Sequence, residues 1–281
     1  TGNDDHEAIA VAPSTLWSLT ADRRRPGSLA QSVERLGQAA RGVRDQMSND
    51  TWMVLAAVER AVGPRAIQPE SQAAGDAYLL TAHTQTLAGM LALSGMAAES
   101  MVQDVGWTMM DIGKRIERGL GLTALLRATL CTVRSPGAEQ TVTESMLVAC
   151  ESSVIYRRRT LGKISVSAVA DLVLFDGENP RSLVYQFERV RQDLRRLPSS
   201  SGASRSERLA DDIAARLRRV DPDDLEIIGP DGTRAELADL LDDQIHDPDD
   251  KRRPGDYPAK IIGHREARER ALSAYKAMKG E

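Results

Sequence analysis

The sequence contains one helix-opening pattern twice, and this echo constrains the fold more than any other feature. PGSLAQSVER begins at Pro26, and PRSLVYQFER begins at Pro180. After each proline, apolar residues follow at steps of three and four, which places them on one stripe of a helix. The stripes are Leu29, Val33, Leu36, Ala40, Val43 and Met47 in the first copy, and Leu183, Phe187, Val190, Leu194 and Leu197 in the second.

Each copy is therefore predicted to form an amphipathic helix that starts at its proline, where the missing N–H costs nothing. The simplest explanation of the echo is a pair of related helical units packed together. Chance similarity between two helix starts is the alternative. Contact through the two stripes, or through equivalent partner helices, is what a duplication predicts.

Outside the two copies, the sequence pattern favours helices along almost the whole stretch up to about Asp243. Aromatic residues make up only 4% of the chain, which argues against the composition typical of sheets. Helices are expected near 49–61, 70–97, 99–133, 140–161, 165–175 and 203–219, with a last one reaching about Asp243. The predicted fold is an all-α multi-helix bundle at 1–243, followed at 244–281 by a flexible, charged, Pro-rich linker and a short peripheral helix.

Charge and cysteine content exclude several classes of protein. The net charge is −4 with acids and bases interspersed, so no nucleic-acid partner is expected. No apolar run approaches the roughly 20 residues that span a bilayer, so no membrane partner is expected either. Cys131 and Cys150 have no ligand-spaced neighbours, and we expect free thiols and a cytoplasmic location.

The most informative stretch is MVQDVGWTMMDIGKRIERGLGL, from Met101 to Leu122. At about 3.6 residues per turn, one helix face is apolar: Val105, Met109, Ile112, Ile116 and Leu120. The opposite face carries Trp107, Asp111, Lys114 and Arg118, with Glu117 beside them. Asp111 lies at i,i+3 spacing from Lys114 and at i,i+4 from Arg115.

Two interpretations of this polar face stay open. It can be solvated and joined by weak ion pairs. Alternatively it is covered, as a large aromatic residue such as Trp107 favours. In that case Asp111, Glu117 and Arg118 must be paired, since unpaired buried charges are very costly. Glu151 is then a candidate partner from across the bundle.

A second cluster ends the stretch CESSVIYRRRTLGK. Its cations, Arg157, Arg158, Arg159 and Lys163, meet no acid between Ser152 and Ala170. They can satisfy the last carbonyls and the negative end of a helix. They can also bind an anion, because Arg presents forked donors that fit a carboxylate or phosphate.

Familiar catalytic signatures are missing from the sequence. It has no phosphate loop, no GxSxG elbow, no paired-His spacing and no zinc pattern. The histidines are scattered, and His83 is expected to be a packed or surface residue. We therefore expect no metal and no cofactor, and catalytic residues stay unassigned.

Four stretches resemble the bacterial alpha-E family, whose all-helical domains are named for a Glu-Arg motif. In the first, MVQDVGWTMMDIGKRIERGL, the matching residues are Met101, Asp104, Gly106, Trp107, Gly113, Lys114, Glu117 and Arg118. The others are RPGSLAQSVERLGQAARGVRDQMSNDTW at 25–52, CESSVIYRRR at 150–159 and NPRSLVYQFERVRQDLRRLP at 179–198. The resemblance covers about 15–243 and weakens after Leu197.

This resemblance implies an association with circularly permuted ATP-grasp proteins and transglutaminase-like proteins, to which members are fused or beside which they are encoded. That context suggests ATP-dependent peptide or amide-bond formation. The leading hypothesis is an accessory helical module, not catalytic by itself, that docks the ligase or its peptide substrate. Glu117 and Arg118 would hold a buried polar network, and the arginines at 157–159 would meet an anionic group.

The alternative is an enzyme of the same pathway, with a cleft lined by Asp111, Glu117, Glu151 and the arginines. Convergent carboxylates of perturbed protonation in a cleft would favour the enzyme, and a closed bundle would favour the module. Family members also begin with a helix bearing a WLGRYxERAE-like segment, and none precedes Thr1. We therefore expect uncovered apolar surface that another chain, such as a second copy, would bury.

Overall fold

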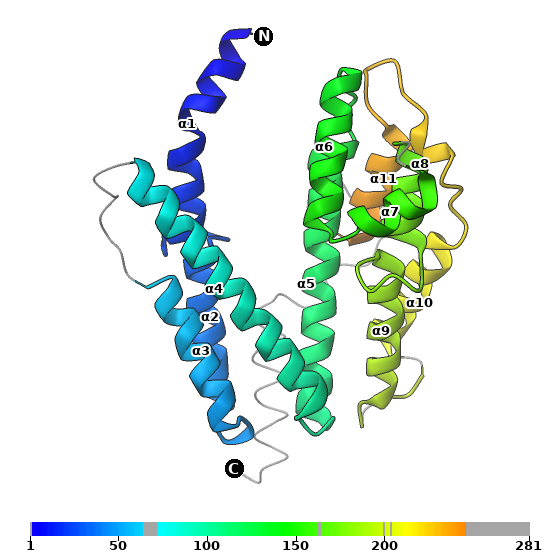
Figure 1. The fold of residues 1–281 in the computed structure, drawn as a ribbon. Helices are drawn as coiled ribbons and strands as arrows, with labels where there is room; N and C mark the ends of the chain where they lie inside the picture. Colours follow the sequence, from blue (N-terminus) through cyan, green and yellow to red (C-terminus); the bar gives the residue numbers. More distant parts are fainter. Residues whose placement is uncertain (1, 64–71, 162–163, 199, 203, 246–281) are drawn as a thin grey trace. The chain divides into compact units, whose positions relative to one another are not determined.

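The computed structural model describes residues 2–63, 72–161, 164–198, 200–202 and 204–245, and within these ranges the regular elements are all helical (Figure 1). The predicted all-α fold is confirmed. The chain divides into two compact units, Thr1–Val102 and Gln103–Glu281. No helix among the described residues is both long enough and apolar enough to cross a bilayer. The tail expected at 244–281 lies almost wholly outside the described residues.

The described part of the first unit contains four α-helices: α1 (Gly2–Ala21), α2 (Leu29–Gly42), α3 (Asn49–Ala61) and α4 (Gln72–Glu99). α3 packs along α4, and α2 lies against α1 and α3. The core is small: Ala30, Val33, Val58, Val62 and Ala82. Gly89 allows the close approach of α3 to α4, because a Cβ there would lie 2.2 Å from Val58 Cγ2.

The second unit is larger and centres on α5 (Val105–Leu130), which packs against α9 (Leu183–Arg196), α6 (Pro136–Ala149) and α11 (Ala235–Ile245). α10 (Arg205–Leu217) covers another side of α9. Two short helices, α7 (Ser153–Thr160) and α8 (Val166–Ala170), lead into a π-helical turn at Asp171–Phe175. Leucines from α5, α9 and α11 lie in one continuous core.

Several predicted helix boundaries were wrong. The helix expected at 140–161 breaks into α6 and α7, because Glu151 adopts a left-handed conformation (φ 51°). No Gly or Pro announces that break in the sequence. The first long helix ends at Gly42 rather than near Met47 and gives way to a 3₁₀ turn at Arg44–Gln46. α1 was not expected, since it contains Pro13 and its apolar residues form no clear stripe.

The two copies of the repeated pattern fold into the same capping turn, at 22–28 and at 176–182. The Ser28 hydroxyl donates to the Asp22 carbonyl at 2.6 Å and accepts from the Gln31 N–H at 3.1 Å. The second copy repeats both bonds: the Ser182 hydroxyl donates to the Asp176 carbonyl at 2.5 Å and accepts from Tyr185 N–H at 3.1 Å.

The capping residue of each copy is therefore the serine, two positions after the proline. The prediction that Pro26 and Pro180 occupy the first helical position was wrong, since the helices begin at Leu29 and Leu183. A serine that accepts from the third N–H of a helix is a strong N-cap, so each helix begins directly after its serine and not at the proline.

Beyond the turn, the two helices bury different faces. α2 buries Ala30, Val33, Gly37 and Ala40. α9 buries Leu183, Gln186, Val190 and Asp193. Counted from the capping serines, the buried positions differ by one residue, which rotates the buried face by about 100°. The division of the chain into two related helical units stays a prediction.

Replacing Ser182 with Ala is expected to lower the free energy of unfolding by about 1 kcal/mol, because both capping hydrogen bonds are lost. Chemical denaturation of the parent and the variant measures this difference. The matched control is Ser206→Ala, at an exposed position inside α10, which should change stability by less than about 0.5 kcal/mol. Equal effects of the two substitutions would contradict the capping role.

Candidate functional site

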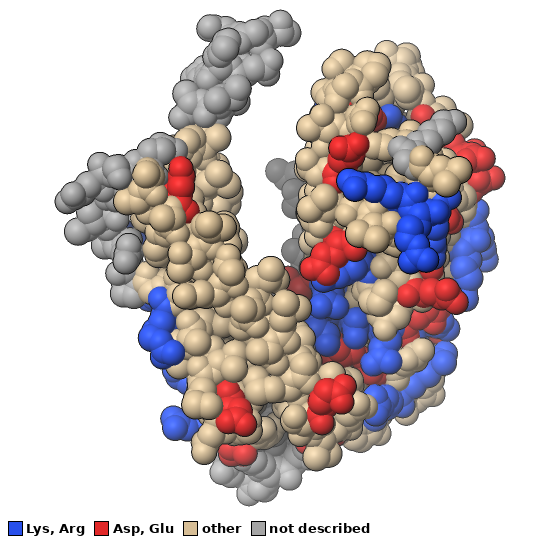
Figure 2. Space-filling view, viewed as in Figure 1, with Lys and Arg blue, Asp and Glu red and all other residues tan. Residues whose placement is uncertain are grey.

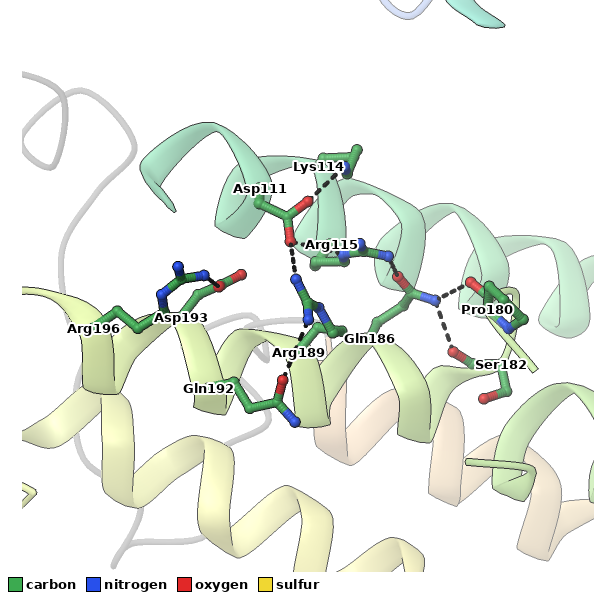
Figure 3. Close-up of polar contacts among 10 residues, drawn as sticks. All are labelled: Asp111, Lys114, Arg115, Pro180, Ser182, Gln186, Arg189, Gln192, Asp193 and Arg196. Carbon is green, nitrogen blue, oxygen red and sulfur yellow. Dashed lines mark hydrogen bonds and ion pairs between the residues drawn. The ribbon is translucent and has the colours of Figure 1, made fainter. Parts of the chain in front are cut away.

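The most concentrated polar chemistry of the second unit lies between α5 and α9. We call it the α5–α9 cluster: Asp111, Lys114 and Arg115 from α5, and Gln186, Arg189, Asp193 and Arg196 from α9 (Figure 3). The two helices make the most extensive helix–helix contact in the unit. Their facing surfaces therefore carry charges where most helix pairs carry apolar side chains.

Asp111 is the centre of the cluster and is fully buried. Its carboxylate lies 2.5 Å from Lys114 Nζ, 3.2 Å from Arg115 Nε and 3.5 Å from Arg189 Nη2. Burial alone would raise the pKa of Asp111. Hydrogen bonds from Lys114 and Arg115, together with the charge of Arg115, instead hold this pKa well below its usual range. Asp111 is thus a carboxylate that stays ionised because cations surround it.

Arg115 extends the cluster to the capping turn of α9. Its guanidinium donates to Gln186 Oε1 at 3.4 Å. The Gln186 amide in turn donates to the carbonyls of Pro180, at 2.8 Å, and Ser182, at 3.0 Å. The guanidinium also lies 5.5 Å from the centroid of the Tyr185 ring. Arg115 therefore links the middle of α5 to the first turn of α9.

Asp193 is the second buried carboxylate, and it is poorly compensated. Neither of its oxygens accepts a hydrogen bond from the described residues, and Arg196 Nη1 lies 3.8 Å away. Burial and the neighbouring Asp111 carboxylate raise the pKa of Asp193, while Arg189 and Arg196 only partly oppose this shift. The two carboxyl groups can share a proton, which Asp193 holds more tightly.

Only some of the residues predicted for the polar network belong to the α5–α9 cluster. Trp107 is buried, with the Arg196 guanidinium 5.8 Å from its ring centroid, and Asp111 and Lys114 belong to the cluster. Glu117, however, is exposed. The buried pairing expected of Glu117 is instead made by Asp111 with Arg115.

Arg118 and Glu151 both interact with Arg181, which lies just before the first turn of α9. Burial lowers the pKa of Arg118, and the charges of Arg181 and Arg115 lower it further, while Asp111 and Glu151 oppose this. Glu151 is exposed and forms a 2.7 Å ion pair with Arg181. Arg118 and Glu151 therefore interact through charge, beside the cluster and not inside it.

Sequence reasoning missed the whole α9 side of the cluster. Gln186, Arg189, Asp193 and Arg196 recur at steps of three and four, which is a polar stripe within an otherwise amphipathic helix. That periodicity was a usable signal. It could not show that this stripe faces α5.

Most of the apolar face of α5 is exposed. Trp107, Asp111 and Arg115 are buried, whereas Val105 and Met109 of the apolar face are 37% and 47% exposed. The covered polar face, one of the two interpretations left open, is the one that the structure supports. Removing the charged face of α5 from water costs free energy. The arginines that α9 places against this face offset that cost.

The arginines predicted to bind an anion are exposed at the end of α7. Arg159 is committed to Asp176 at 2.6 Å. Arg157 lines a small hollow of about 90 Å³ together with Tyr156 and Ile164. Lys163 lies outside the described residues. Within the described part of the chain neither Arg157 nor Arg158 has an ion pair, which leaves both open to an anionic partner.

The chemistry that the α5–α9 cluster can perform depends on whether a substrate can reach it from the surface. A larger hollow of about 390 Å³ is lined by residues of α2 and α3, among them Arg41 and Glu59. Neither hollow includes a residue of the α5–α9 cluster. Among the described residues, no group of three His, Cys, Asp or Glu is arranged to hold a metal ion. The ion pair of Asp111 with Arg189 and the hydrogen bond of Arg115 to Gln186 join α5 to α9.

Comparison with known proteins gives one family and three close relatives. The model of the Alpha-E family, "a predicted alpha-helical domain with a conserved ER motif", matches residues 2–249. Uncharacterised proteins of Mycobacterium bovis and of two Mycobacterium tuberculosis strains are each 68% identical over 238 residues, covering 85% of this chain and 27% of the relative. No solved structure matches the chain significantly.

Proposed function

Because the chain belongs to the Alpha-E family, we propose that it is an accessory helical module of an ATP-grasp-linked system that forms or modifies peptide or amide bonds. It docks a circularly permuted ATP-grasp ligase, a transglutaminase-like protein or their peptide substrate. The chain spans about a quarter of the length of the curated relatives that it matches (27%). Their remaining length has room for the catalytic domains of such a system.

The observation that carries the proposal is the closure of the α5–α9 cluster. Its carboxylates, Asp111 and Asp193, are both fully buried. A substrate that reached them would have to separate α5 from α9. Acid–base chemistry needs a carboxyl group within hydrogen-bond reach of the substrate. A structural role in a docking module fits this arrangement better than catalysis.

The alternative, an enzyme of the same pathway, rests on a specific observation. Two neighbouring carboxyl groups have pKa values shifted in opposite directions, as is common in active sites. Structural ion networks produce the same shifts. Glu117 and Glu151, the other carboxylates of the expected cleft, are exposed, which weakens this second candidate.

The docking surface that we assign runs along one side of α7, from Val154 in its first turn through Arg157 and Arg158 to Leu161 just after its end. Val154 and Leu161 are 71% and 95% exposed. Two arginines beside exposed aliphatic side chains suit an acidic partner surface with apolar contacts. Arginines are also among the side chains that dominate binding energy at interfaces.

Reversing both charges, in Arg157→Glu/Arg158→Glu, is expected to weaken binding to the ATP-grasp protein about 10-fold or more. Titration calorimetry with the purified ligase measures this affinity. The matched control is Arg216→Glu/Arg219→Glu, which reverses two exposed arginines at the end of α10 and should change the affinity less than about twofold. Loss of binding in both variants would show only nonspecific attraction, and retention in both would reject this surface.

A further inference from the structure

One face of α4 is apolar, and the described residues of the first unit leave it exposed. Its six central positions alternate in steps of three and four: Ala77, Leu80, Thr84, Leu87, Leu91 and Ser94. Every one of them is exposed, and the leucines are exposed by 70%, 56% and 60%. The opposite side of α4, including Ala82, packs against α3 and α1. We call the six exposed positions the α4 seam.

The α4 seam lies on a helix surface without charge. No Asp, Glu, Lys or Arg occurs between Asp76 and Glu99, a stretch that covers most of α4. In Figure 2 the surface over α4 is almost entirely uncharged, whereas acidic and basic side chains alternate over the second unit. A solvated helix normally carries charged residues on its outer face. This surface is therefore suited to a partner.

The spacing identifies the form of that partner. Apolar residues that repeat with a mean step of 3.5 residues form the seam along which two helices supercoil. Small residues at the ends of the seam, Ala77 and Ser94, let two helices approach closely. The surface fits another helix, lying nearly parallel or antiparallel to α4.

The order of residues in the α4 seam indicates which helix binds to it. Read from either end, the seam has the same order of residue types: a small residue, a leucine, the central pair Thr84 and Leu87, a leucine and a small residue. Reversing α4 therefore lays Ala77 on Ser94, Leu80 on Leu91 and Thr84 on Leu87. This is the self-complementarity that a two-fold interface requires, since the same patch must fit itself.

From this register we infer that the α4 seam binds the α4 seam of a second copy of the chain, in antiparallel orientation, about a two-fold axis between Thr84 and Leu87. The charges at the ends permit this pairing. Asp76 lies level with Gly95 of the second copy, and Glu99 lies beyond the last seam position. No like charges oppose each other, and the leucines lose their contact with water.

Cross-linking of single cysteines tests the register. In a background with Cys131→Ala and Cys150→Ala, Leu80→Cys and Leu91→Cys are purified separately and then mixed under mild oxidation. The mixture should form a disulfide-linked dimer, because positions 80 and 91 lie level across the axis. Each variant alone should not, since its two cysteines would be displaced by about 16 Å along the axis, beyond the roughly 7 Å that a disulfide spans.

The oligomeric state of the parent chain and of two lysine variants provides a second test of the antiparallel pairing. The parent chain should be dimeric by analytical ultracentrifugation at micromolar concentration. Leu87→Lys should raise the dimer dissociation constant more than 10-fold, while Val148→Lys, an equally drastic change at an exposed position of α6, leaves it unaltered. Circular dichroism confirms that both variants are helical. A parent that stays monomeric, a dimer indifferent to Leu87→Lys, or cross-linking by one cysteine variant alone would overturn the antiparallel pairing.

Discussion

Replacing Asp111 with Asn is expected to lower the free energy of unfolding at neutral pH by about 3 kcal/mol. The substitution keeps the shape of the side chain and removes the charge that Lys114, Arg115 and Arg189 share. Lys114 and Arg189 can turn toward water. Arg115 is buried and loses its main partner, so it carries most of the penalty.

Urea denaturation at several pH values checks this prediction and its sign. The pKa of Asp111 is lowered in the folded chain, so its contribution to stability is fully present above the pKa of the unfolded chain, about 4. It is lost as the pH falls from there toward the folded pKa. The deficit of Asp111→Asn should therefore shrink below about pH 4. Asp212→Asn, at an exposed position on α10, is the control and should be neutral within about 0.5 kcal/mol.

Replacing Asp193 with Asn is expected to act in the opposite direction and to stabilise the chain by about 1–2 kcal/mol at neutral pH. Asp193 is buried beside Asp111, and its own oxygens accept no hydrogen bond from the described residues. Asn keeps the volume and supplies an amide N–H₂ that can donate to the Asp111 carboxylate. The repulsion that arises when Asp193 ionises beside Asp111 cannot occur in the variant.

The pH dependence of this gain follows from the raised pKa of Asp193. Below the pKa of the unfolded chain, Asp193 is protonated in both states and the substitution changes little. As the pH rises through the folded pKa, the parent must ionise a buried carboxyl group and loses stability. The advantage of Asp193→Asn should therefore grow with pH from about 4 upward. A gain independent of pH would point to packing rather than charge.

Local patterns in the sequence were sufficient for several of the helices and for part of the cluster. The helix expected near 49–61 is α3, and the structure shows that Ser48 caps its start. The spacing of Asp111, Lys114 and Arg115 on one helix also needed no tertiary information. These features depend on neighbours within about one helical turn.

The remainder depended on packing that no local pattern reveals. On α5, the sequence showed an apolar face with Val105 and Met109 and an opposite face with Trp107, and it left open whether the second face is covered. Deciding this required the polar stripe of α9 as the partner of α5. The left-handed Glu151, which separates α6 from α7, likewise has no sequence signal. Here tertiary contacts override periodicity.

The most direct test of the central claim, that the α5–α9 cluster is a structural clamp, is the unfolding free energy of Asp111→Asn and Asp193→Asn measured side by side at pH 7. A clamp predicts opposite signs, with a loss of about 3 kcal/mol for Asp111→Asn and a gain for Asp193→Asn. Two variants that unfold like the parent, yet abolish ligation in the assay with the ATP-grasp protein, would contradict the clamp and identify these carboxyl groups as chemical participants.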